Sequence, residues 1–188
     1  MVIPTSFVDG GTKNPEFLRK NPNGQVPLLE LDDGRRIAES NAIMLYLEEQ
    51  QLELQRGKGV DSSPPCLIPR DAYQRATMYQ WMFFEQYSHE PAIAVRRANV
   101  VFQRPCSEEK MQQLLDKGYW ALGVMEEQLA KTPFMVGEDM TLADISLYAY
   151  THVADEGGYD MSKYANVKSW LQRVKASEGF WGMDILGS

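Results

Sequence analysis

Hydrophobic residues are spaced in two different ways in this sequence. In the first 50 residues they form short runs separated by turn-forming residues, which is typical of strands and brief helices. Asp33-Gly34 predicts a hairpin, because both central residues of such a turn need a positive φ. The predicted strands are residues 2–8, 26–31 and 35–38, and the predicted helices are residues 15–20 and 40–50.

From residue 70 onward, apolar residues recur at the i, i+3, i+4 spacing of helices. Residues 71–89 are apolar around much of their circumference, which predicts a buried central helix. Pro91 is expected to kink or interrupt that helix because proline lacks the N–H, and Ser107 is expected to begin the next one. The apolar faces expected of the later helices are Met111, Leu114, Leu115, Leu122, Met125 and Leu129; Leu142, Ile145, Ala149 and Val153; and Val167, Trp170, Leu171 and Val174.

A stretch of different character separates these two regions. The segment RGKGVDSSPPCLIP is rich in Gly, Ser and Pro, which is typical of a linker. We therefore expect a first domain of residues 1–54, a linker of residues 55–69 and a second domain of residues 70–188. The expected fold class is α+β but mostly α, with a small mixed domain followed by an all-α helical-bundle domain.

Composition narrows the class of protein. With 188 residues, of which 44% are apolar, the chain can bury a sizeable core. The net charge is −7 and arginines cluster only in pairs, which disfavours a nucleic-acid partner. No run approaches the roughly 20 apolar residues of a membrane span, and the first residues lack the pattern of a secretory signal. We expect a cytoplasmic protein without a nucleic-acid or membrane partner.

The dipeptide Val26-Pro27 opens a predicted strand with a residue that cannot donate a ladder hydrogen bond. A cis bond here costs only about 0.5–1 kcal/mol relative to trans and would turn the N–H and C=O of Val26 out of the sheet. An extended, peptide-like ligand could pair with those groups, as in strand addition. A trans bend without a ligand is the structural alternative.

The dipeptide Glu39-Ser40 lies where the predicted hairpin ends and a helix begins. Helix N-termini leave N–H groups unpaired and carry a partial positive charge, so a carboxylate docked there gains roughly 0.3–1 kcal/mol. The Ser40 hydroxyl adds a donor and Glu39 can receive an ammonium group, which together suit an α-amino-acid head group. The structural alternative is that Ser40 simply caps its helix.

Either dipeptide alone favours the structural interpretation, but the two are joined by one short hairpin. A ligand with a free amino-acid end and a peptide middle fits both, and glutathione is such a ligand. The stretch NPNGQVPLLELDDGRRIAESNAIMLYL resembles the second half of the thioredoxin-like domain of soluble glutathione transferases. The segments LIPRDAYQRA, FMVGEDMTLADISLY and YANVKSWLQRVKASEGF resemble helices of the family's all-α domain, so the resemblance covers nearly the whole chain.

The resemblance implies a role for each residue of the predicted site. Val26, opening the strand with Pro27, pairs with the cysteinyl backbone of glutathione, the co-substrate. Glu39 and Ser40 hold the γ-glutamyl end, and Gln25 contributes near the glycyl end. The implied partners are glutathione, an apolar electrophilic small molecule and a second copy of the chain in a twofold dimer. No metal site is expected.

Compared with the family, the chain lacks the first strand and helix, which carry the Ser, Tyr or Cys that activates the thiol. We therefore assign no catalytic residue. In the family's sheet the absent strand is central, and each buried unsatisfied backbone group would cost roughly 1–3 kcal/mol. We expect residues 1–20 to rearrange or become mobile, or another chain to cover the gap.

Three functions follow, in descending order. The first is a glutathione transferase-like protein that uses the thiol of glutathione on an electrophile, with an activity that the absence of the thiol-activating segment would impair. The second is a non-catalytic glutathione-binding or protein-assembly module on the same fold. The third is a thiol–disulfide oxidoreductase that uses Cys66 or Cys106, and it is the weakest because neither cysteine is near the predicted site in sequence.

Several other residues have a structural interpretation and a functional one. Thr141 and Asp144 of TLAD form a capping box, worth about 1 kcal/mol, which we assign to folding. His89 and His152 have no partners at metal-ligand spacing and are expected to be packed or to lie on a helix surface. Core packing is expected for three aromatic residues that could instead line a second-substrate pocket: Tyr73, Trp81 and Phe84.

Overall fold

The structure is a computed structural model that describes residues 3–5, 10–57 and 66–183. The chain divides into two compact units, Met1–Ser63 and Pro64–Ser188. The division falls within residues 55–69, the expected linker.

The first unit contains a β-hairpin between two helices. After a 3₁₀ turn at Gly11–Lys13, α1 spans Pro15–Lys20, and the side chain of its N-cap Asn14 accepts the N–H of Phe17 at 2.8 Å. The antiparallel strands are β1, Leu28–Glu30, and β2, Arg36–Ala38, and α2 follows at Ser40–Gly57. Arg36 faces Glu30 across the hairpin at 2.8 Å, and this hydrogen bond lowers the pKa of the Glu30 carboxyl.

The hairpin turn differs from the expected one. Among the described non-glycine residues only Glu39 and Gln103 have a positive φ, so Asp33 does not, whereas Gly34 has φ 85°. The N–H of Leu31 donates to the carbonyl of Arg35 at 2.8 Å, which closes a three-residue loop ending in a left-handed glycine. A second expectation, the strand at residues 2–8, lies mostly outside the described residues, and residues 3–5 form no strand.

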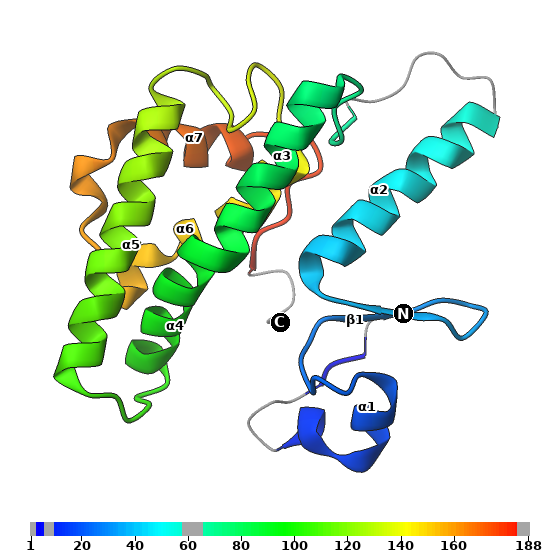
Figure 1. Cartoon of the computed structure of the whole chain (residues 1–188), viewed down its shortest axis with the longest axis horizontal. Coiled ribbons are helices and arrows are strands. Elements are labelled where there is room, and N and C mark those ends of the chain that lie inside the picture. The colour runs from blue at the N-terminus through cyan, green and yellow to red at the C-terminus, as the bar shows by residue number, and fades with distance from the viewer. Residues whose placement is uncertain (1–2, 6–9, 58–65, 184–188) are drawn as a thin grey trace. The chain divides into compact units, whose positions relative to one another are not determined.

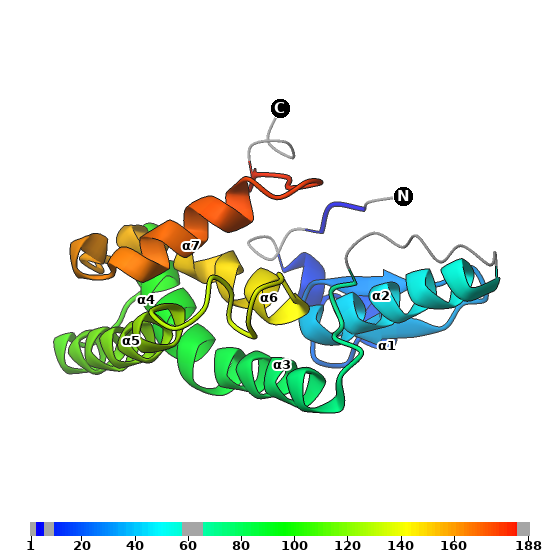
Figure 2. The ribbon, with the colours of Figure 1, turned by 90° about the horizontal axis from the view of Figure 1, so that it is seen from above.

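The second unit is a bundle of helices (Figure 1). Helix α6 lies between a layer that contains α3, α4 and α5 and the helix α7, as Figure 2 shows. The described elements are α3, Ala72–Phe84; a π-helical turn, Glu85–His89; α4, Glu90–Val101; α5, Glu108–Leu129; α6, Leu142–Thr151; short 3₁₀ turns at Ala154–Gly157 and Met161–Lys163; and α7, Ala165–Lys175.

The π-helical turn accommodates Pro91. Proline at the second position of α4 cannot donate to the preceding turn, so one wide turn is inserted before it. The N–H of Glu90 donates to the carbonyl of Glu85, five residues back. The helical path therefore continues from α3 through the turn into α4, with its hydrogen-bond pattern interrupted as expected.

The core of this unit surrounds α6. The α6 side chains that face inward include Leu142, Ala143 and Leu147, whereas Ala149, expected in the core, is exposed. Buried residues of the neighbouring helices complete the core: Met78, Trp81, Met82, Ile93, Leu114, Leu122, Met125, Leu129, Val167, Trp170 and Val174. The inward faces of α5 and α7 follow the expected helical periodicity.

The capping box at the start of α6 is confirmed. A carboxylate oxygen of Asp144 accepts the N–H of Thr141 at 2.8 Å. The other oxygen accepts the N–H of Met135 and the indole N–H of Trp170, each at 2.9 Å. Burial raises the pKa of this carboxyl while the hydrogen bonds oppose the rise. Asp144 thus ties α6 to α7 and to the loop before α6, beyond its role as a cap.

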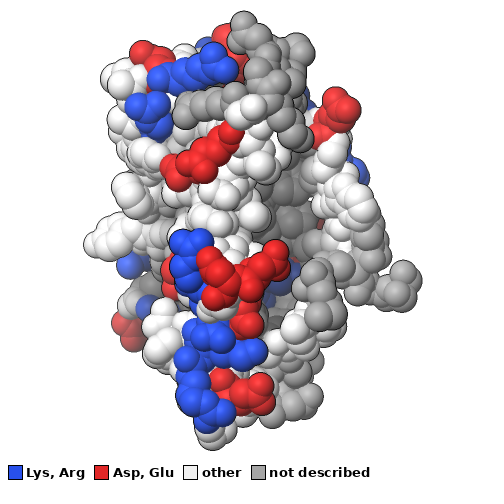
Figure 3. Space-filling view, turned by 90° about the vertical axis from the view of Figure 1, so that its right-hand side faces the viewer, with Lys and Arg blue, Asp and Glu red and all other residues white. Residues whose placement is uncertain are grey.

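Charged side chains of both signs are mixed on the surface. On the face drawn in Figure 3, Lys and Arg lie beside Asp and Glu instead of forming an area of one sign. Within the described part of the chain, no helix has the length and apolarity needed to cross a membrane. The expectation against a nucleic-acid partner stays a prediction.

Candidate functional site

The loop between α1 and β1 is held by one buried amide. Asn21 is only 4% exposed, and its Nδ2 donates to the carbonyl of Gln25 at 2.8 Å. Its Oδ1 accepts the N–H of Asn23 at 3.3 Å, and its carbonyl accepts the N–H of Gly24 at 2.9 Å. A single side chain therefore fixes the path of the chain up to Val26.

A close approach inside this loop requires glycine. Gly24 has φ 59°, and a Cβ at this position would lie 2.9 Å from the carbonyl oxygen of Thr12. The same Cβ would lie 2.7 Å from Nζ of Lys13, whose ammonium donates to the carbonyl of Asn23 at 3.2 Å. The loop consequently carries a positive charge that the sequence alone did not place there.

Val26 lies at the exposed end of the loop, just before β1. Gln25, Val26 and Pro27 are all exposed, and Val26 is 44% exposed although it is apolar. The Val26-Pro27 bond is cis, as the sequence allowed. Within the described residues, the backbone of Val26 has no recorded hydrogen bond, so its polar groups are free to pair with an extended ligand.

Glu39 is held in an unusual backbone conformation at the start of α2. Its φ is 71°, a left-handed value that costs a non-glycine residue roughly 1–2 kcal/mol. Its carbonyl accepts the N–H of Ile43 at 2.9 Å, and α2 begins at the next residue, Ser40. Strained residues of this kind are found at ligand clamps, where the surrounding structure fixes them.

The two halves of the predicted site meet through one hydrogen bond. Nδ2 of Asn23, in the loop, donates to Oε1 of Glu39 at 3.3 Å, although sixteen residues separate them in sequence. The structure therefore brings the Val26 loop beside the N-terminus of α2. An exposed carboxylate, a helix N-terminus and an exposed strand end lie together, and this arrangement can hold an ammonium, a carboxylate and an amide.

Three contributors to this arrangement were missed by sequence reasoning: Lys13, Asn21 and Asn23. The turn-forming composition of residues 21–24 signals a loop, but it does not show which amide is buried. Lys13 carries no signal at all, because its proximity to Gly24 depends on how the 3₁₀ turn packs against the loop.

The remaining candidates lie in the second unit. His89 is fully buried with its Nε2 2.8 Å from the hydroxyl of Thr151, and the described residues contain no group of three metal ligands. Cys66 and Cys106 are half-buried, and within the described residues neither forms a disulfide. Trp81 is in the core and meets Phe84 edge-on at 5.3 Å, as expected, but Tyr73 is 81% exposed, so core packing was the wrong interpretation for it.

These features define a class: a small domain with a ligand-binding hairpin, followed by an all-α domain. The family model of the glutathione S-transferase N-terminal domain matches residues 3–50, and that of the C-terminal domain matches residues 75–178. The chain therefore belongs to the glutathione S-transferase family, and the expected fold class, α+β but mostly α, is confirmed.

Relatives from distant organisms align over most of the chain. It is 30% identical to glutathione S-transferase D7 of Drosophila melanogaster, over 95% of this chain and 74% of that protein. Among solved structures, a glutathione S-transferase from Pseudomonas fluorescens is 44% identical, with a TM-score of 0.83, over 95% of this chain and 83% of that one. Another from Xanthobacter autotrophicus is 37% identical, also with a TM-score of 0.83, over 98% and 84%. Glutathione is accordingly the co-substrate that goes with this family.

Proposed function

We propose that this chain binds glutathione across the hairpin and uses its thiol on an apolar electrophile. The observation that carries the proposal is the hydrogen bond between Asn23 and Glu39, which joins the Val26 loop to the N-terminus of α2. A ligand with both a peptide unit and an amino-acid head contacts these two places at once. Residues 1–54 would form the glutathione-binding domain and residues 70–188 the all-α domain.

The chemistry of each group matches one part of glutathione. The free backbone of Val26 pairs with the cysteinyl amide, as one strand pairs with another. The Glu39 carboxylate receives the γ-glutamyl ammonium, and Ser40 with the N-terminal N–H groups of α2 receives the γ-glutamyl carboxylate. Glutathione has a second carboxylate on its glycyl end, to which Lys13, whose ammonium contacts the loop at Asn23, and the exposed side chain of Gln25 can donate.

A titration by calorimetry tests the site. Replacing Ser40 by Ala should weaken glutathione binding about tenfold, because it removes a donor to a charged carboxylate, equivalent to about 1.4 kcal/mol. Ser107→Ala is the matched control: Ser107 caps α5 through a 3.2 Å bond from the N–H of Lys110, so its loss should lower stability and leave glutathione affinity unchanged. Equal affinities of wild type and Ser40→Ala would overturn the site.

Conjugation to chlorodinitrobenzene then separates an enzyme from a binding module. Glutathione-dependent turnover that falls with Ser40→Ala supports the transferase. Binding without turnover supports the alternative, a non-catalytic glutathione-binding module, and turnover that is unaffected by Ser40→Ala contradicts the assigned residues. The third hypothesis, a thiol–disulfide oxidoreductase, needs a separate assay: it predicts that replacing Cys66 or Cys106 by Ser abolishes reduction of a disulfide substrate.

We extend the proposal to a homodimer in the cytoplasm. Tyr73 and Phe83 on α3 are 81% and 71% exposed, and exposed large aromatic side chains are typical of interaction surfaces when they form part of a larger apolar patch. Two cysteines that form no disulfide within the described part of the chain suit a reducing compartment.

A further inference from the structure

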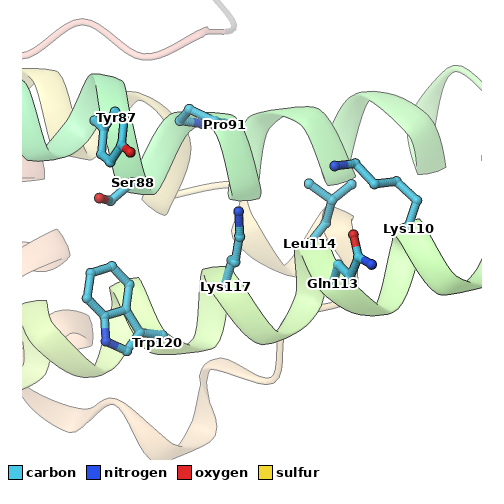
Figure 4. Close-up of a pocket in the computed structure, with 8 residues that line it drawn as sticks. All are labelled: Tyr87, Ser88, Pro91, Lys110, Gln113, Leu114, Lys117 and Trp120. Carbon is cyan, nitrogen blue, oxygen red and sulfur yellow. The ribbon is translucent and has the colours of Figure 1, made fainter.

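His152 and Met183 bring two potential ligands for a soft metal ion together in the second unit. His152 directly follows α6, and 31 residues separate it from Met183 in sequence. Its Nε2 lies 3.3 Å from the thioether sulfur of Met183. The spacing of histidines gave no sign of this pair, because the two side chains meet only in the folded chain. Neither residue lines the hollow between the π-helical turn and α5 (Figure 4).

The hydrogen bond at Nδ1 leaves the lone pair of the His152 imidazole on Nε2. Nδ1 lies 2.9 Å from the carbonyl oxygen of Tyr148. A carbonyl oxygen only accepts, so Nδ1 carries the hydrogen and donates it. In the neutral ring, Nε2 then has no hydrogen and can bind a metal ion. Metal-binding histidines commonly donate their other ring N–H to a backbone carbonyl in this way, which fixes the tautomer.

Aromatic packing holds the ring in this orientation. The imidazole of His152 stacks on the ring of Tyr148, with centroids 4.7 Å apart and an interplanar angle of 7°. Tyr148 in turn meets Trp170 and Phe180 edge-on, with centroids 6.1 and 5.5 Å apart. Trp170 is fully buried, so this group of rings is anchored in the core. The position of Nε2 is therefore set before any metal ion binds.

The distance between the two atoms fits a metal ion held between them. A thioether has no hydrogen to donate, so the sulfur and a neutral Nε2 offer each other only lone pairs. Bonds of first-row metal ions to imidazole nitrogen and to sulfur are about 2.0 and 2.3 Å long, so ligands 3.3 Å apart form an angle of roughly 100° at the ion. That angle is close to tetrahedral. Met183 is 60% exposed, which leaves the remaining positions open to solvent.

We propose that His152 and Met183 bind Cu(I). A thioether is a soft ligand that selects Cu(I), and imidazole also binds copper, whereas Mg²⁺ and Ca²⁺ prefer oxygen ligands. Zn²⁺ sites use three or four protein ligands, and the described residues contain no group of three His, Cys, Asp or Glu side chains to supply them. The ion enters and leaves as Cu(I), so binding needs no oxidant or reductant.

An NMR titration of the full chain under nitrogen tests this proposal, with Ag(I) as a redox-inert probe and Cu(I) afterwards. The readouts are the Cε1–H signal of His152 and the methyl signal of Met183, which report this site even while the cysteine thiols take up metal. Both signals should shift together until the site is saturated. The same concentration of Zn²⁺ should leave both signals in place. The buffer contains no glutathione, because its thiol would compete for the metal.

Matched variants assign the two ligands. Met183→Leu keeps the apolar character and removes the sulfur, so it should weaken Ag(I) binding at His152 by about tenfold or more. His152→Gln should abolish the shift of the Met183 methyl signal. Met140→Leu removes a sulfur that accepts the hydroxyl of Ser177 at 3.6 Å, and His89→Gln removes the other histidine of the chain. Both of these control variants should keep the wild-type affinity for Ag(I).

The melting temperature of each variant shows whether it is folded. The proposal is overturned if Met183→Leu binds Ag(I) like wild type, if Zn²⁺ binds equally well, or if only the thiols take up metal. It is also overturned if the two signals respond to pH but not to Ag(I), because a protonated imidazole would then be donating to the sulfur. Ser40→Ala changes the other unit and should not affect Ag(I) binding, so the two proposals fail independently.

Discussion

The residues around the hairpin have different structural and proposed functional roles. Asn21 is buried and fixes the loop, whereas Glu39 and Ser40 are exposed. The left-handed backbone of Glu39 supports the proposed ligand site, because folding alone would favour glycine at that φ. A glycine at this position would avoid the backbone strain, but it would have no carboxylate to receive the ammonium group of the proposed ligand.

His89 makes stability depend on pH. Burial lowers the pKa of its imidazole from 6.5 to about 3, and its Nδ1 has no hydrogen-bond partner among the residues that the structure describes. Above pH 6.5 the ring is neutral in both the folded and unfolded states. At lower pH, the imidazole of His89 binds a proton in the unfolded chain but stays largely neutral in the folded protein. The free energy of unfolding therefore falls, by about 2 kcal/mol at pH 5.

Urea unfolding at pH 7 and pH 5 measures this effect. His89→Gln keeps a polar side chain at the site but cannot titrate, so its loss of stability between the two pH values should be smaller than that of wild type by about 2 kcal/mol. Comparing the change within each protein removes the effect of the substitution at pH 7. Parallel pH dependences would show that His89 does not titrate differently on folding.

The proposed site combines residues that sequence reasoning predicted from local patterns with residues that come close only in the folded chain. Val26 and Glu39 stand in local patterns with a physical meaning, a proline-opened strand and a helix start. Lys13 reaches the loop only after the 3₁₀ turn has packed. Tyr73 shows the converse limit: helical spacing identifies an apolar side chain, but not whether its own chain covers it.

At the scale of elements, most helices begin where a capping residue stands. Ser107 and the TLAD box were readable from sequence because their partners lie three residues away. The hairpin was also predicted from sequence, but its turn type was not. Asp33-Gly34 fits a two-residue loop, whereas the hydrogen-bonded pair of Leu31 and Arg35 leaves three residues in the loop. The extent of α2, which runs to Gly57, was equally hidden, because helix ends depend on weak local preferences.

Helix α5 packs closely against the turn at residues 154–159 because Gly118 has no side chain. A Cβ at Gly118 would lie 2.3 Å from the hydroxyl oxygen of Tyr159. That hydroxyl donates to the carbonyl of Leu114 at 2.8 Å and is buried. Gly118→Ala should therefore displace the ring and lower the free energy of unfolding by about 1–3 kcal/mol, measured by urea unfolding.

The same helix offers a matched control. Nothing lies within 4 Å of the position that a Cβ would take at Gly123. Gly123→Ala should raise stability by up to about 1 kcal/mol, because alanine is the better helix former and no contact is disturbed. If both variants changed stability in the same direction, helix propensity and not packing against Tyr159 would govern α5.

At the scale of the whole molecule, the two units have different roles. The first unit carries the proposed glutathione contacts on a hairpin and two helices, and the second unit has the large core. The composition change near residues 55–69 and the switch to helical spacing made this division visible in the sequence. Surfaces that another molecule would cover could not be predicted from the sequence, because the exposure of apolar side chains depends on how the helices pack.

Self-association is expected to use α3. Tyr73 and Phe83 are ten residues apart, about 2.8 helical turns, so their directions differ by about 80° around the helix and a broad interface could cover both. Introducing a carboxylate there would bury a charge in any interface that covers this face. Phe83→Glu should therefore shift the mass in solution from twice 21.4 kDa to 21.4 kDa at micromolar concentrations, as measured by light scattering after gel filtration.

The control for this prediction is Val100→Glu. Val100 is 43% exposed near the end of α4, so the same new charge there should leave the dimer intact. Both variants should retain the wild-type helical content, because each site is exposed in the single chain. A wild-type protein that is monomeric at all concentrations would refute the dimer. A Phe83→Glu variant that stays dimeric would move the interface to another face, because an unpaired carboxylate is not tolerated in the apolar centre of an interface.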